Sequence, residues 1–177
     1  MHDEFHCKPP GWYCYPWGPH RHPAPQGCRL SGTGHTDLPG RYRGIRGNGR
    51  SRCPSRGDAV FVRTGRWARR AELGAWDVAR SAAGLHASTM PWFKARDVSF
   101  LGGDAASDLV PSQIEGVGLP IHLLTIVAMG VDLFDNQDLE AVAETAARLN
   151  RWEFMVIAAP LAVEGGTGSP VNVLAIF

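Results

Sequence analysis

The chain has 177 residues, of which 44% are hydrophobic and 20% are charged, and its formal net charge is +1. This length allows one domain of ordinary size with its own hydrophobic core. The near-neutral charge is no signal of nucleic-acid binding, and the absence of an apolar stretch of 18 residues excludes a membrane-spanning helix, so we expect neither kind of partner.

The composition changes abruptly near residue 56. All four cysteines, five of the seven histidines and eight of the thirteen prolines precede Gly57, whereas valine is absent there. The first 56 residues carry nine basic and three acidic side chains, or +6, and the remainder carries −5. So few apolar side chains cannot offset the entropy of ordering a backbone. We therefore expect a disordered or frame-disrupted segment over residues 1–56 and a folded domain over residues 57–177.

The N-terminus is polar and lacks the apolar run of a signal peptide, which favours a cytoplasmic location. In that compartment the cysteines are expected to be free thiols. Their spacing contains no Cys-x-x-Cys pair, which argues against a zinc knuckle.

The first half of residues 57–177 predicts a strand, helix, strand unit. A short apolar run over residues 59–62 is typical of a buried strand. An Arg- and Trp-rich loop is expected next, and residues 88–96 predict a short helix with Ser88 as its N-cap. Residues 98–101 predict the second strand, which ends at two glycines and an aspartate.

The second half alternates helices with strands. Residues 121–129 predict a helix after Pro120, closed by Gly130. Helical spacing of apolar residues predicts another helix over residues 137–150, with Asp135 and Asn136 where an N-cap belongs. Residues 154–158 and 171–177 predict the last two strands. The whole pattern indicates an α/β domain.

Several segments of this domain resemble, in order, motifs of the cyclase family that includes bacterial kynurenine formamidases. The matching stretches are GDAVFVRTG at residues 57–65, LGGD with Ser107-Asp108 at residues 101–108, LPIH at residues 119–122, DNQDLE at residues 135–140, and PL with GGTGSPVN at residues 160–172. They cover about 120 residues, the second two-thirds of the chain.

The resemblance implies a swivelling β/β/α domain that hydrolyses an amide or lactone-like bond with a divalent metal, zinc or manganese, often as a homo-oligomer. Imidazoles and carboxylates bind such an ion, and the ion lowers the pKa of a bound water so that hydroxide can attack a carbonyl. The expected partner is a small-molecule substrate. Matched residue by residue, His122 corresponds to a histidine of the site and Asp135 to its later acid, where relatives commonly have glutamate.

Each of these two residues also has a structural interpretation. A histidine in a first helical turn often serves only as a hydrogen-bonded structural residue. Asp135 would equally serve as a helix N-cap. By resemblance, His122 is the candidate catalytic residue, and His122 and Asp135 are the candidate metal ligands.

The family's N-terminal ligand motif, His-x-Gly-Thr-His-x-Asp-x-Pro-x-His, has only an incomplete counterpart. Residues 31–39 contain His35 and Asp37 in a His-x-Asp-x-Pro fragment, but no histidine precedes the Gly-Thr, and Arg41 replaces the last histidine. The fragment is either a coincidence or a partial metal site, and we interpret it as a coincidence. The domain is then expected to lack its N-terminal part.

Two functional hypotheses follow from the sequence. The first is a metal-dependent hydrolase resembling arylformamidase, which would hydrolyse the amide of N-formylkynurenine in tryptophan catabolism, or a related amidase or lactonase. The alternative is an inactive, truncated remnant without the N-terminal metal-binding motif.

Overall fold

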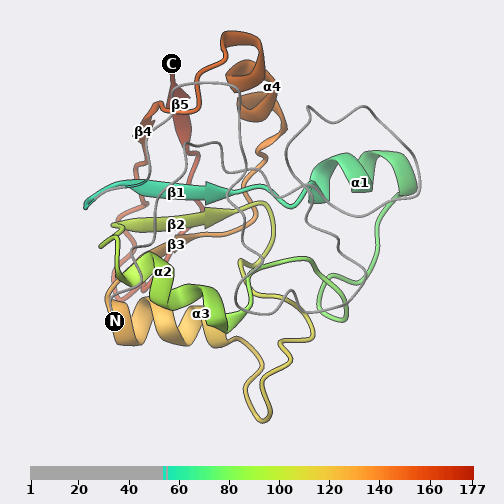
Figure 1. Ribbon diagram of the computed structural model, residues 1–177, viewed down its shortest axis with the longest axis vertical. Coiled ribbons are helices and arrows are strands. Elements are labelled where there is room, and N and C mark those ends of the chain that lie inside the picture. The colour runs from blue at the N-terminus through green and yellow to red at the C-terminus, as the bar shows by residue number, and fades with distance from the viewer. Residues whose placement is uncertain (1–53, 55) are drawn as a thin grey trace, which may run out of the picture.

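The computed structural model describes residue 54 and residues 56–177, and within them it forms a small parallel sheet with helices on one face and a β-hairpin on the other (Figure 1). The elements are β1 (Ala59–Val62), α1 (Arg66–Leu73), the 3-10 helix η1 (Ala87–Thr89), α2 (Met90–Lys94), β2 (Phe100–Gly103), α3 (Pro120–His122), the π-helix η2 (Leu123–Met129), β3 (Asp132–Phe134), α4 (Glu140–Leu149), β4 (Met155–Ile157) and β5 (Leu174–Ile176).

The parallel sheet has the strand order β1-β2-β3, and β2 pairs with both neighbours. Val62 lies opposite Gly103, and Gly102 lies opposite Phe134, so the carboxyl ends of all three strands meet at one edge. Ligand sites of open parallel sheets lie outside this edge. The chain leaves the strands there at Thr64, Asp104 and Asp135.

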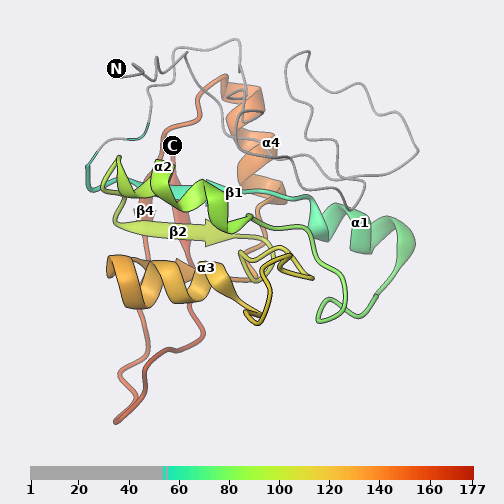
Figure 2. The same ribbon diagram turned by 60° about the horizontal axis from the view of Figure 1, so that its bottom comes forward.

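The hydrophobic core lies between this sheet and the helices α2, α3 and η2, which share one of its faces (Figure 2). Strand residues alternate between the two faces of a sheet, so Val60 and Val62 point into this core while Phe61 points away. Leu101 and Ile121 are fully buried at its centre. The helix that carries His122 is thereby packed directly against the sheet.

Aromatic side chains cover the other face of the sheet. The rings of Phe61 and Phe100 stack against Phe134 with centroids 6.0 and 5.1 Å apart. Phe154, next to β4, approaches Phe61 at 6.0 Å. The antiparallel pair β4-β5 crosses behind the sheet in Figure 1. These contacts make the hairpin the third layer of the fold.

Most predicted elements are confirmed, with shifted boundaries. The strand over residues 59–62 has its predicted limits, and the helix after Pro120 ends at Gly130 with a left-handed φ of 67°, as predicted. The second strand runs from Phe100 to Gly103, two residues later than predicted, and the last two strands are shorter than predicted.

Three sequence predictions are wrong, and one strand was missed. The Arg- and Trp-rich segment forms the helix α1 rather than a loop, and the short strand β3 was not predicted. His86, not Ser88, caps η1, because its ring accepts the Ser88 N–H. The helix predicted from residue 137 begins at Glu140, so Asp135 and Asn136 do not cap it.

No helix in residues 56–177 is long and apolar enough to cross a membrane.

Candidate functional site

The candidate site consists of three side chains in a hydrogen-bonded row at the carboxyl edge of the parallel sheet: Asp108, His122 and Asp135. The Nδ1 atom of His122 lies 2.6 Å from Oδ2 of Asp108, and its Nε2 atom lies 3.0 Å from Oδ2 of Asp135. The structure thus brings the two sequence-predicted site residues, His122 and Asp135, into direct contact. It also adds Asp108, which the sequence analysis placed in a motif but not in the site.

Asp108 is fully buried and holds the imidazole of His122 in one orientation. Its second carboxylate oxygen accepts the backbone N–H of Ile121 at 2.6 Å. A carboxylate fixed in this way is the usual partner of the Nδ1–H of a histidine that acts through Nε2. Asp108 therefore directs Nε2 of His122 toward Asp135 and the sheet edge.

His122 is placed by the start of its helix. Pro120 occupies the first helical turn, where its missing N–H costs no hydrogen bond. The ring of His122 is about a quarter exposed, at 27% of its side-chain surface. The turns that follow are π-helical, a form that is frequent at functional sites. Thr125, fully buried, donates its hydroxyl to the Ile121 carbonyl at 2.7 Å and ties this region together.

Asp135 lies directly after β3 and is oriented by both carboxylate oxygens. Its Oδ1 accepts the hydroxyl of Ser107 at 2.8 Å, while its Oδ2 faces His122. The side chain is 26% exposed, so it is open on one side. This geometry replaces the N-cap interpretation, because the carboxylate points toward His122 and not toward the helix α4.

The segment after Asp135 is anchored to β2 and α1. The backbone N–H groups of Asn136 and Gln137 donate to the carbonyls of Ala105 and Gly103, both at 3.0 Å. Asn136 adopts a left-handed φ of 59° and receives a hydrogen bond from the Arg66 guanidinium. The position of Asp135 is therefore set by the turn that contains it.

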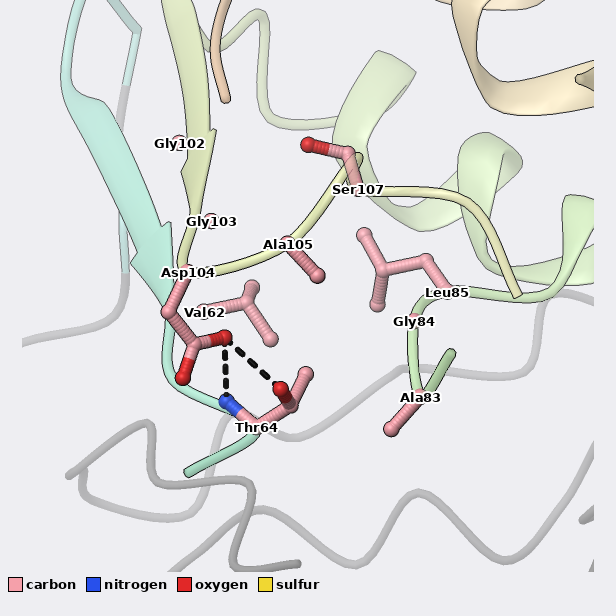
Figure 3. Close-up of a pocket in the computed structure, with 10 residues that line it drawn as sticks. All are labelled: Val62, Thr64, Ala83, Gly84, Leu85, Gly102, Gly103, Asp104, Ala105 and Ser107. Carbon is pink, nitrogen blue, oxygen red and sulfur yellow. Dashed lines mark hydrogen bonds between the residues drawn. The ribbon is translucent and has the colours of Figure 1, made fainter. Parts of the chain in front are cut away.

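Asp104 organises the neighbouring turn between β1 and α1. Its carboxylate accepts the backbone N–H and the hydroxyl of Thr64, both at 2.8 Å (Figure 3). It also accepts the backbone N–H groups of Gly65 and Arg66 at 2.7 and 3.0 Å. A carboxylate at a helix N-terminus satisfies donors that the helix leaves free and complements its dipole. Asp104 is fully buried, so its role is structural: it joins the ends of β1 and β2.

A small pocket adjoins this arrangement (Figure 3). It lies between the carboxyl ends of β1 and β2 and residues 83–85, and its lining includes Thr64, Asp104 and Ser107. Because the Ser107 hydroxyl also donates a hydrogen bond to Asp135, the pocket lies next to the candidate site. Trp67 and Trp76, in and after α1, donate their indole N–H groups to the carbonyls of Gln137 and Ser81.

The donor set at His122 and Asp135 fits a divalent metal site in part. Imidazole nitrogen and carboxylate oxygen are ordinary ligands of zinc and manganese, and an Nδ1–H held by a carboxylate is their common companion. Zinc sites use three or four protein ligands, and among residues 56–177 no group of three His, Cys, Asp or Glu side chains is arranged to hold a metal ion. His35, Asp37 and the four cysteines lie outside the described residues.

A crystal structure described as that of a novel cyclase resembles this chain. The two share 27% sequence identity with a TM-score of 0.58, over 72% of this chain. The chain spans 42% of the length of that cyclase. No protein-family model and no curated protein matches the chain. The similarity in fold and sequence supports a cyclase-like α/β domain, in agreement with the motifs in residues 57–172.

Proposed function

We propose that the chain is a metal-dependent hydrolase of the cyclase type, acting on an amide or lactone-like bond of a small molecule in the manner of arylformamidases. The observation that carries the proposal is the contact of His122 with Asp135, backed by the buried Asp108. These residues come from two separate motifs of the resemblance. Their convergence at the sheet edge is what a shared site requires.

His122 and Asp135 are the residues of this chain that would hold zinc or manganese. Such an ion supplies a water-derived nucleophile near neutral pH and polarises a carbonyl. Asp108 keeps the Nδ1–H of His122 engaged, so the Nε2 lone pair stays directed toward the site in the neutral ring. If His122 is protonated, both ring nitrogens donate to carboxylates, and the same pair can give up or hold a proton beside the substrate.

The pocket beside Ser107 has room for about one water molecule. Val62 and Leu85 give the pocket apolar surface, and Thr64, Asp104 and Ser107 give it polar groups. A substrate would therefore lie outside it, at the open side of His122 and Asp135, whose side chains are 27% and 26% exposed. N-formylkynurenine is the first substrate to test, and a homo-oligomer in the cytoplasm remains part of the proposal.

The alternative is an inactive remnant, and the observation that favours it is that the described residues bring only two candidate ligands together. A remnant would fold without binding metal tightly. The two hypotheses differ in metal stoichiometry and in activity.

The test uses the purified 177-residue chain. Zinc and manganese are titrated by calorimetry, and hydrolysis of N-formylkynurenine is followed with and without each metal. The hydrolase proposal expects tight binding and metal-dependent turnover, both lost in His122→Ala and retained in His86→Ala. A folded wild-type chain that neither binds metal nor turns over formamides or lactones would establish the remnant instead.

A further inference from the structure

We propose that Ser107 is a positioning residue that selects which oxygen of Asp135 faces His122. This inference rests on the proposed function, because it assigns to Asp135 a role in the site. Nothing in the sequence comparison singles out the serine hydroxyl for this task.

The Ser107 hydroxyl is buried and hydrogen-bonded within the candidate site. Its Oγ donates to Oδ1 of Asp135 at 2.8 Å, and the residue is only 6% exposed. A β-carbon added to Gly103 would lie 3.4 Å from this Oγ, so β2 packs against the hydroxyl on one side. Figure 3 shows the hydroxyl pointing toward β2 and away from Leu85.

The backbone of Ser107 adopts an unusual conformation that this position requires. Its φ is 57°, in the left-handed region that non-glycine residues seldom occupy. Its carbonyl accepts the Leu85 N–H at 2.7 Å, which holds the turn in place. Strained conformations of this kind persist where the surroundings enforce them, and often at functional sites.

Two consecutive residues, Ser107 and Asp108, therefore orient the two candidate ligands. Ser107 bonds one oxygen of Asp135, and Asp108 bonds Nδ1 of His122. One turn therefore orients both candidate ligands, which otherwise belong to separate segments after β3 and in α3. With Oδ1 occupied, the Asp135 oxygen left for an ion or a proton is Oδ2, 3.0 Å from Nε2 of His122.

The test compares Ser107→Ala, Ser107→Gly and the control Ser112→Ala. Ser112 is also buried, at 7% exposure, but its hydroxyl donates to the carbonyls of Ile114 and Val117 rather than to the side chains of the site. Glycine adopts a positive φ without strain, so Ser107→Gly removes the hydroxyl while relieving the backbone. A role in backbone strain alone predicts that Ser107→Gly behaves like the wild type.

Two measurements are made on each variant. Zinc affinity is expected to fall about 10-fold in both Ser107 variants and to stay within twofold in the control, as for loss of other groups that orient metal ligands. In the metal-free protein, the Nε2 resonance of His122 is expected to shift in both Ser107 variants and not in the control. Wild-type behaviour of Ser107→Gly in both measurements would overturn the inference.

Failure of the proposed function has a different signature. If Asp135→Asn leaves the zinc affinity unchanged but shifts the Nε2 resonance of His122, the proposed metal-binding role of Asp135 is wrong. The role of Ser107 is then decided by the His122 resonance in the metal-free protein alone. If Asp135→Asn abolishes zinc binding but both Ser107 variants match Ser112→Ala, only the inference about Ser107 fails.

Discussion

Asp108 and His122 form a 2.6 Å contact in which the carboxylate is fully buried and the imidazole is partly open to solvent. The same carboxylate also accepts the Ile121 N–H, one residue before the histidine. Asp108 thus fixes both the backbone and the ring of the helix start that carries His122. A buried carboxylate is costly unless it is fully hydrogen-bonded, which makes this arrangement sensitive to small changes.

Replacing Asp108 with Asn is expected to impair both the site and the fold. The amide preserves the shape but supplies a weaker, neutral acceptor for the His122 Nδ1–H, so the ring orientation is no longer secured. We expect zinc affinity to fall by about 10- to 100-fold, and unfolding free energy to fall by about 1–3 kcal/mol. Calorimetric titration and urea denaturation measure the two effects.

The matched control for this variant is Asp132→Asn, at an exposed aspartate in β3. This variant should change neither the zinc affinity nor the unfolding free energy. Equal zinc affinities in Asp108→Asn and Asp132→Asn would show that Asp108 does not orient the site.

Replacing Asp104 with Ala is expected to loosen α1. The substitution removes the acceptor of three backbone N–H groups and of the Thr64 hydroxyl. Buried donors left without a partner cost free energy, and we expect a loss of about 2–4 kcal/mol. Hydrogen exchange should accelerate most at Thr64, Gly65 and Arg66, since these amides lose their acceptor. Uniform acceleration across all helices would contradict a local capping role.

Local patterns predicted the elements whose determinants are close in sequence. The strand β1 and the end of η2 are examples. A short apolar run indicates a buried strand, and a glycine after a helical segment indicates a left-handed residue that ends the helix. The helix α1 was missed because its N-cap position is Gly65, which offers no side-chain acceptor. The acceptor comes instead from Asp104, which lies 38 residues after Arg66.

The candidate site shows the same limit. His122 and Asp135 were identified through resemblance to family motifs, and their contact depends on β3, a three-residue strand without a clear apolar alternation. Asp108 and Ser107 belonged to a matched motif, but nothing local indicated which groups they bind. Their placement after the central strand β2 is the signal that could have identified them, since polar residues at the carboxyl ends of parallel strands gather at one edge.

Replacing Gly84 with Ala is expected to disturb the site from outside it. A β-carbon at this position would lie 2.1 Å from the carbonyl oxygen of Asp108 and 2.6 Å from the amide nitrogen of Leu109. These are backbone atoms, so the turn holding Asp108 must move. We expect a loss of about 1–3 kcal/mol of unfolding free energy together with weaker zinc binding.

Gly118→Ala is the control for this change, because a β-carbon there meets no atom within 4 Å. Thermal unfolding and zinc titration are measured on both variants. Should Gly84→Ala match Gly118→Ala in both, the close packing of residue 84 on the Asp108 backbone would be refuted.

The close contact of Gly102 with Phe61 makes the aromatic layer testable by a double-mutant cycle. A β-carbon on Gly102 would lie 2.4 Å from Cδ1 of the Phe61 ring, which also faces Phe134 and Phe154. Gly102→Ala alone should cost about 1–3 kcal/mol, because the ring must leave its position between the sheet and the hairpin. In the Phe61→Ala background the added methyl group has room, so the second substitution should cost almost nothing. The expected coupling free energy is about 1–2 kcal/mol, measured by urea denaturation of the four proteins. Additive costs would mean that Phe61 does not occupy the space above Gly102.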